Sequence, residues 1–278
     1  MRFTCSQIKF LSPEHFRILL AIELGSKNHE SVPLSLIQSI SKAKCNLDSI
    51  ITDLVKQKFI KGIPYTGYEG YALTYTGYDN LALYALQKEG KLWGVGGKIG
   101  VGKESDLYLG MSPEKKLVCI KIHRLGRVCF KTVKLNRDYH QNRKYTSWMY
   151  LSRLSAEKEF EHMTRLWGKI PIPRPISQNR HVVVMEYLEN YTTLCKIPKT
   201  GNTLPRQLKP TLLKILEDMA ELGYAHGDFN EFNIMIRNDY QKVKIIDFPQ
   251  MVPIDDPRGP EYRERDRTGL DAYFKEFS

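Results

Sequence analysis

The sequence predicts an α+β protein in two parts, a winged helix-turn-helix over residues 1–91 and a compact two-lobed domain over residues 92–278. Three observations lead to this prediction. Residues 1–91 combine short helical patterns with one pair of strands, and residues 92–186 are rich in apolar strands. Residues 187–278 then combine a long amphipathic pattern with short strands that carry acids and an amide. The lobes are therefore expected to meet near residues 186 and 187.

The N-terminal part is expected to hold helices over 13–24, 33–40 and 46–55, a hairpin over 59–75 and a closing helix over about 79–86. Asn46 is expected to cap the third helix. In winged helix-turn-helix modules the third helix often enters a nucleic-acid groove. Here it carries Asp48 and Asp53, which weakens the case for tight DNA binding. Docking to RNA, docking to protein and a purely structural role stay open.

The composition argues against membrane, secreted and disulfide-rich or zinc-binding proteins. No apolar run approaches the ~20 residues of a membrane span, so no membrane association is expected. The first residues, Met1 to Ser6, lack the basic start and apolar core of a signal peptide. The five cysteines are scattered without a Cys-x-x-Cys pair, so neither a zinc site nor a disulfide framework is expected. A reducing interior compartment fits best.

The net charge of +11 is concentrated in one stretch. Residues 121–153 contain nine bases against the single acid Asp138, with aromatic side chains among them. The bases are Lys121, Arg124, Arg127, Lys131, Lys134, Arg137, Arg143, Lys144 and Arg153. Such a stretch could bind a nucleic-acid backbone, because phosphate contacts come mostly from lysine and arginine. A solvated charged loop is the alternative.

The most informative stretch is His-x-Asp-x-x-x-x-Asn at residues 226–233, followed by an apolar strand that ends in Asp247. This order is typical of the catalytic half of kinase-like phosphoryl transfer. Asn233 and Asp247 supply the hard oxygen ligands that Mg²⁺ requires. Asp228 fits the further carboxylate that orients the group attacking the γ-phosphate of ATP. A capped loop after a helix would explain an isolated His-Gly-Asp, but not the whole ordered set.

A glycine-rich segment precedes the first apolar strands and could wrap triphosphate oxygens with its backbone N–H groups. Its candidate nucleotide-binding residues are Gly100, Gly102, Lys103, Glu104 and Ser105. Residues 97–103 also match the start of a Walker A motif, but Glu104 stands where a hydroxyl should reach Mg²⁺. The strand lysine Lys121 favours the kinase-like interpretation, in which this lysine contacts the α- and β-phosphates.

Four further residues complete the candidate nucleotide site. A helix over 148–167 carries Glu159 at the border of its apolar face, where it could pair with Lys121, and Glu157 stays an alternative. The strand ending at Met185, Glu186 and Tyr187 is expected to lead into the hinge, where Met185 lines the pocket and the other two offer main-chain contacts to adenine. Met185 could equally be plain core.

These motifs resemble one known family, the RIO kinases, and the resemblance is to the type-2 RIO kinases that carry an N-terminal winged helix. The supporting motifs are 100–106 (GVGKESD), 121–126 (KIHRLG), 137–139 (RDY), 226–233 (HGDFNEFN) and 246–250 (IDFPQ). The resemblance implies a bilobal kinase-like domain that uses ATP and Mg²⁺, with Lys121, Asp228 and Asp247 as catalytic residues. It also implies that Asp247 accepts phosphate, and that the protein associates with the maturing small ribosomal subunit.

Residues 248–278 contain three prolines and no Ala-Pro-Glu, so we expect no long activation segment. ATP hydrolysis coupled to a switch on a large particle is then favoured over phosphorylation of peptides. The leading hypothesis is an Mg²⁺-dependent serine/threonine kinase or ATPase that acts on pre-ribosomal particles through rRNA and proteins. The second is a nucleic-acid-binding regulator that only senses nucleotide, and the third is a P-loop NTPase. Away from the particle we expect a monomer in the cytoplasm, with passage through the nucleus as an alternative.

Overall fold

The computed structural model of the chain describes residues 11–43, 46–65, 68–125, 148–198 and 204–275. The chain divides into two compact units, one made of Met1–Arg153 with Gln178–Val182 and the other of Leu154–Ser177 with Val183–Ser278. The division falls within helix α6 (Trp148–Leu166) and within the strand pair β7 (Pro175–Asn179) and β8 (Val182–Glu186). The domain boundaries expected near residues 91 and 186 stay a prediction.

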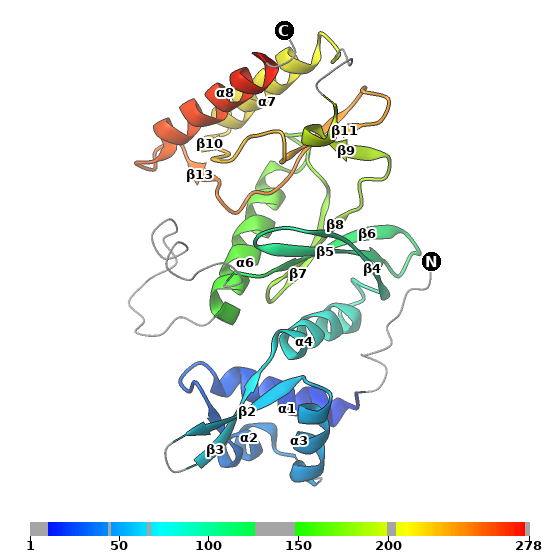
Figure 1. The fold of residues 1–278 in the computed structure, drawn as a ribbon, viewed down its shortest axis with the longest axis vertical. Helices are drawn as coiled ribbons and strands as arrows, with labels where there is room; N and C mark the ends of the chain where they lie inside the picture. The colour runs from blue at the N-terminus through cyan, green and yellow to red at the C-terminus, as the bar shows by residue number, and fades with distance from the viewer. Residues whose placement is uncertain (1–10, 44–45, 66–67, 126–147, 199–203, 276–278) are drawn as a thin grey trace. The chain divides into compact units, whose positions relative to one another are not determined.

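The first unit begins with the expected winged helix-turn-helix (Figure 1). Its elements are α1 (Pro13–Gly25), β1 (Val32–Pro33), α2 (Leu34–Ser41), α3 (Leu47–Lys56), β2 (Ile60–Tyr65), β3 (Tyr68–Leu73) and α4 (Tyr75–Lys88). The strands form an antiparallel sheet in the order β1-β3-β2. Asn46 caps α3 as expected, because its side chain accepts the N–H of Ser49 at 3.4 Å.

The core of this module is built from one apolar stripe on each helix. Fully buried side chains include Ile22 of α1, Ile37 of α2 and Leu54 of α3, and Phe59 joins them from the segment before β2. Burial of such side chains supplies most of the stability of a small helical module. Asp53, on the other face of α3, bonds His15 at 3.0 Å and Gln57 at 2.8 Å. This acid therefore serves the module itself.

The closing helix begins earlier than predicted, at Tyr75 instead of about Asp79. Thr74 explains the difference, because its hydroxyl accepts the Gly77 N–H at 3.1 Å and so caps the helix at this point. Gly77 lies within the helix, and this position requires glycine because an added Cβ would lie 2.1 Å from the Phe59 carbonyl oxygen. Strand β3 ends at Leu73, two residues before the end of the predicted hairpin, for the same reason.

The first unit continues with an antiparallel meander of β4 (Gly94–Val101), β5 (Ser105–Met111) and β6 (Leu117–His123). The whole sheet has the strand order β4-β5-β6-β8-β7. Strand β4 shifts register against β5 on both sides of Lys98, as expected for a segment rich in glycine. His123 at the end of β6 donates its N–H to the carbonyl of His181, in the β7–β8 turn, at 2.9 Å.

The second unit places a small sheet beside two helices. Its elements are the greater part of α6, β9 (Tyr191–Thr193), η2 (Leu194–Lys196), α7 (Leu208–Glu221), β10 (Tyr224–Ala225), β11 (Ile234–Arg237), β12 (Val243–Ile245), β13 (Val252–Pro253) and α8 (Gly259–Lys275). One sheet has the order β12-β11-β9, and β10 pairs with β13. Helices α7 and α8 lie side by side (Figure 1).

Helix α8 was not predicted from the sequence. It begins at Gly259, and the segment between Asp247 and this helix holds only β13. The α+β class is confirmed. No helix among the described residues is long and apolar enough to cross a bilayer.

Candidate active site

The predicted catalytic loop connects β10 to β11. It begins with His226, whose side chain is fully buried, and turns at Gly227, where φ is +77°. A Cβ at Gly227 would lie 2.5 Å from the Tyr262 ring and 3.0 Å from the Gln250 carbonyl oxygen. Both the positive φ and the crowding require glycine here. Asp228 follows this turn and is half-buried.

Both carboxylate oxygens of Asp228 are held by neighbouring amides. Asn230 donates to Oδ1 at 2.9 Å, and Asn233 donates to Oδ2 at 2.9 Å and to the Asp228 main-chain carbonyl at 2.8 Å. Because the Asn233 nitrogen is directed at Asp228, its amide oxygen is the atom available to a cation. The loop is thus ordered around Asp228 by its own polar side chains.

The β11–β12 hairpin brings Asp247 to the same place. Ile234 and Ile245 are partners in its register, and the N–H of Ile246 donates to the Asn233 carbonyl at 3.0 Å. Asp247 therefore follows directly on the residue bonded to Asn233. Its φ is +72°, a left-handed conformation that is costly for residues other than glycine, asparagine and aspartate.

Two neighbouring negative charges mark this place as a cation site. Burial raises the pKa of Asp228 above its ordinary value, and the charge of Asp247 raises it further, against the opposing effects of His226, Asn233 and Arg265. An Asn oxygen and an Asp carboxylate suit Mg²⁺, which takes few protein ligands and completes its shell with water and phosphate oxygens. The described residues contain no group of three or more His, Cys, Asp or Glu side chains that could hold a metal by themselves. The donor set thus fits a metal shared with a phosphorylated ligand.

His226 supports the loop from inside. Its Nε2 lies 3.3 Å from the Ile246 carbonyl oxygen, and its Nδ1 accepts the Asp228 N–H at 3.3 Å. Burial lowers the pKa of His226 despite three nearby aspartates, so the ring is neutral and carries its proton on Nε2. The ring also packs against Phe229 and Phe248. His162 of α6 donates from Nδ1 to the Phe248 carbonyl at 2.8 Å, which fixes the residue after Asp247.

Helix α8 contributes two residues that the sequence analysis did not single out. The buried carboxylate of Asp266 accepts the N–H groups of Gly227 at 2.8 Å and Phe229 at 2.9 Å, and Arg265 donates to the Gly227 carbonyl. The loop is therefore clamped on both sides of Asp228. A signal was present in the sequence, because Asp266, Leu270 and Tyr273 recur at helical spacing and all three are buried.

The glycine-rich residues lie in the first unit, on β4, β5 and the turn between them. Gly100 lies near the end of β4, and Ser105 is the first residue of β5. The Gly102 N–H donates to the Ser105 carbonyl at 2.8 Å. Gly102 and Lys103 are exposed, whereas Glu104 and Ser105 are half-buried. The P-loop alternative is wrong, because a P-loop joins a strand to a helix and this turn joins two strands.

Lys121 and Glu159 are each placed as the sequence predicts. Lys121 lies on β6 opposite Leu107 of β5 and is 8% exposed, and Glu159 lies on α6 and is 1% exposed. Glu157 is only half-buried, which favours Glu159 over this alternative. Lys121 belongs to the first unit and Glu159 to the second, and their pairing stays a prediction.

The expected hinge residues follow β8. Met185 is buried. The Glu186 N–H donates to the Arg174 carbonyl, and its carboxylate accepts the Arg174 N–H, both at 2.9 Å. The Tyr187 carbonyl accepts the Glu189 N–H at 3.1 Å. The Glu186 N–H and the Tyr187 carbonyl are therefore used within the protein, and the predicted contacts to adenine stay untested.

The RIO domain family matches residues 106–278, and the Rio2 N-terminal family matches residues 8–89. The chain belongs to the RIO kinase family. Its two matched regions together identify it as a Rio2-type member, an atypical kinase with a winged-helix domain before the kinase-like domain.

Relatives and solved structures agree with this RIO assignment. The serine/threonine-protein kinase rio2 of Schizosaccharomyces pombe is 45% identical over 270 residues, which cover 96% of this chain and 77% of the relative. RIO2 of Caenorhabditis elegans is 41% identical, and there the match covers 99% of this chain but 51% of the relative. The crystal structure of the Rio2 kinase–ADP/Mg²⁺–phosphoaspartate complex from Chaetomium thermophilum matches with a TM-score of 0.84 and 39% identity, covering 99% of this chain and 83% of that one.

Proposed function

We propose that this RIO kinase binds ATP with Mg²⁺ and hydrolyses it through a phosphorylated aspartate, Asp247. The observation that carries the proposal is the meeting of Asp228, Asn233 and Asp247 on one loop and one hairpin. The Chaetomium thermophilum Rio2 structure, a complex with ADP, Mg²⁺ and a phosphoaspartate, supports the same chemistry. Bound Mg²⁺ would neutralise phosphate charge, with Asn233 and Asp247 as its protein ligands.

Asp247 and Asp228 act in successive steps of the proposed reaction. An oxygen of the Asp247 carboxylate attacks the γ-phosphorus of ATP, a new O–P bond forms, and the bond to the β,γ-bridging oxygen breaks as ADP leaves. A water molecule then attacks the phosphorus, its proton passes to the Asp228 carboxylate, and phosphate leaves as the Asp247 carboxylate is restored. Asn230 and Asn233 hold Asp228 in place for this proton transfer. Lys121 and the 102–105 turn are assigned to the phosphates.

Turnover with labelled ATP tests this proposal. Purified protein with Mg²⁺ and γ-labelled ATP should release phosphate and carry a label that hydroxylamine removes, since an acyl phosphate is sensitive to this nucleophile. Phosphate release should depend on both Asp228 and Asp247, whereas the label should depend on Asp247 and persist when Asp228 is replaced. Binding of ATP without either signal would favour the alternative of a regulator that only senses nucleotide.

We further propose that the protein acts on precursors of the small ribosomal subunit, in the cytoplasm, and contacts rRNA through its basic stretch. Six of the nine bases of this stretch, Arg127, Lys131, Lys134, Arg137, Arg143 and Lys144, lie outside the described residues. Arg124 does not belong to the RNA-binding set, because its guanidinium is buried in ion pairs with Asp79 and Asp106. The net charge of +11 supports an anionic partner.

RNA binding can be tested with matched charge changes. Neutralising Lys131, Lys134, Arg143 and Lys144 should weaken rRNA binding and lower the slope of log affinity against log salt by about 3. Neutralising Lys115 and Lys116, which are exposed in the β5–β6 turn, is the control and should change the affinity less. Unchanged affinity and slope in the fourfold variant would reject the RNA contact.

A further inference from the structure

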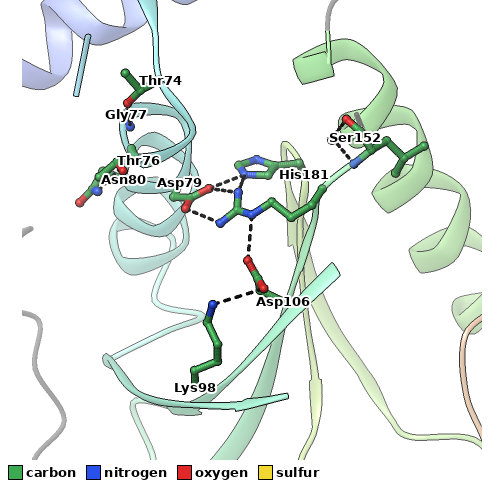
Figure 2. A network of polar contacts seen from close by, with 11 residues as sticks. Thr74, Thr76, Gly77, Asp79, Asn80, Lys98, Asp106, Ser152 and His181 are labelled. Carbon is green, nitrogen blue, oxygen red and sulfur yellow. Dashed lines mark hydrogen bonds and ion pairs between the residues drawn. The ribbon is translucent and has the colours of Figure 1, made fainter. Parts of the chain in front are cut away.

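A chain of buried ion pairs runs through the first unit from the winged helix to the glycine-rich turn (Figure 2). Asp79 lies on α4, Arg124 directly follows β6, and Asp106 is the second residue of β5. The Arg124 guanidinium donates to both oxygens of Asp79, at 2.5 and 2.6 Å, and its Nε donates to Asp106 at 3.1 Å. One cation thus joins two carboxylates from different elements.

The three side chains of this ion-pair series are largely buried. The side chains of Arg124, Asp79 and Asp106 are 7%, 17% and 3% exposed. Burial alone would raise the pKa of Asp79, but hydrogen bonds from Arg124 and His181 outweigh it and lower this pKa below its ordinary value. Removal of one partner from a buried pair leaves an uncompensated charge, so each member is held firmly in place.

His181 in the β7–β8 turn fixes Asp79 from another side. Its Nε2 lies 2.7 Å from Asp79 Oδ1, and its ring stacks on Tyr78 of α4 with centroids 4.3 Å apart. The imidazole is fully buried, and burial lowers its pKa, so the neutral ring donates from Nε2. The position of Asp79 is therefore fixed by His181 as well as by Arg124.

At its other end this series of ion pairs reaches the turn at residues 102–105, here called the phosphate turn. The Arg124 N–H donates to the Glu104 carbonyl at 2.6 Å, while its side chain holds Asp106. Arg124 therefore holds the main chain just before Ser105 and the side chain just after it. It also stands three residues after Lys121, just beyond the end of β6. Asp106 further accepts from Lys98 of β4 at 3.3 Å (Figure 2).

We infer that Asp79, acting through Arg124 and Asp106, is a positioning residue for the phosphate turn, so that helix α4 of the winged helix is a working part of the nucleotide site. This inference rests on the proposed binding of ATP by the turn and Lys121. Its consequence is that the winged helix is more than an appended docking module, because loss of its Asp79 loosens groups that face the triphosphate.

The fold supplies a matched comparison. Arg180 in the β7–β8 turn pairs with Glu23 of α1 at 2.7 and 2.9 Å, with both side chains about as buried as Asp79. This second ion pair also ties the winged helix to the β7–β8 turn, but it does not include Arg124 or the phosphate turn. Its removal should cost stability without moving the turn.

The experiment compares Asp79→Asn with Glu23→Gln in the full chain. Calorimetric Kd for Mg²⁺–ATP should rise between about twofold and thirtyfold in D79N and stay unchanged in E23Q. Amide hydrogen exchange at residues 102–105 without nucleotide should speed up in D79N alone, since the Gly102 N–H is bonded within the turn. Thermal unfolding of both variants gives their stability loss for comparison.

Equal behaviour of D79N and E23Q in both measurements would overturn the inference. If D79N does not fold, Arg124→Lys replaces it, because lysine keeps the charge but loses the bidentate grip, and the same two measurements decide. If the wild-type protein binds no Mg²⁺–ATP, the proposed function fails, while faster exchange at 102–105 in D79N still tests the positioning role by itself.

Discussion

The Asn233 side chain donates its amide nitrogen to both the carboxylate and the main-chain carbonyl of Asp228, at 2.9 and 2.8 Å. This contact joins the candidate base to a candidate metal ligand, so the two cannot be placed independently. Asn233→Ala should therefore impair metal binding and base orientation together. We expect the Mg²⁺ concentration for half-maximal turnover to rise by about tenfold or more, measured by Mg²⁺ titration of ATP hydrolysis. An unchanged Mg²⁺ requirement would remove Asn233 from the metal site.

Asp228→Asn should abolish proton transfer with little change in side-chain shape, and its single amide oxygen can keep one of the two bonds from Asn230 and Asn233. We expect kcat for phosphate release to fall by about a hundredfold to ten thousandfold with little change in KM for ATP. Asp239→Asn is the control, since Asp239 is exposed in the β11–β12 turn and pairs there with Arg237. Retention of full turnover in D228N would contradict the assigned role.

Asp247→Asn should eliminate the hydroxylamine-sensitive label, because an amide cannot form the acyl phosphate. Asparagine tolerates the φ of +72° at this position, so we expect the free energy of unfolding to change by less than about 1 kcal/mol. Labelling with γ-labelled ATP and urea unfolding check the two statements. Asp255→Asn, an exposed position nearby, serves as the control. A label that persists in D247N would place the phosphate elsewhere.

Asp266→Ala should loosen the catalytic loop, since it removes the acceptor of two buried backbone N–H groups. We expect a loss of about 3 kcal/mol in the free energy of unfolding, together with a lower kcat. Asp271→Asn lies on the same helix but breaks only an exposed pair with Lys209, worth about 0–1 kcal/mol. Denaturant unfolding of both variants makes the comparison. Equal losses would mean that Asp266 is no anchor.

Stability should depend on pH through buried histidines. Burial lowers the pKa values of His162, His181 and His226 below the ordinary 6.5. Between the lowered value and 6.5 the unfolded chain binds more protons than the folded protein, so the free energy of unfolding rises with pH through this window and levels off above it. Each imidazole contributes up to about 1.4 kcal/mol per pH unit.

His181→Gln isolates one of these contributions, because glutamine can still donate to Asp79 but does not titrate. Urea unfolding at pH 5.5, 6.5 and 7.5 should give H181Q a flatter profile than the wild type. The raised pKa of Asp228 is present in both proteins and cancels in the difference. His29→Gln, at an exposed position, should leave the profile unchanged. Parallel profiles for H181Q and the wild type would contradict the prediction.

Where the signal was local, the sequence predicted the structure well. The helix that Asn46 caps begins at Leu47, as its N-cap and apolar stripe indicate. The catalytic loop and the strands after it were also predictable, because a hairpin of two short strands must bring Asn233 and the residue after Ile246 together. The start of α4 was misjudged, because the cap at Thr74 precedes a glycine that reads as a breaker.

The anchors of the site were not predictable in this way. Asp266 reaches the catalytic loop across a separation of 39 residues, and Arg124 was expected in a nucleic-acid-binding stretch. Arg124 instead pairs with Asp79 across 45 residues, and His181 meets the same aspartate across 102. A charged residue in a basic run carries no local sign of the carboxylate that it will find.

The sequence by itself determined the winged helix, the strands on either side of the hinge and the spacing of Asp228, Asn233 and Asp247, because periodicity and turn lengths act over a few residues along the backbone. Only the tertiary structure decided which charges are buried and what holds them. Those partners lie on distant elements, and burial makes each pairing obligatory only once the elements have packed.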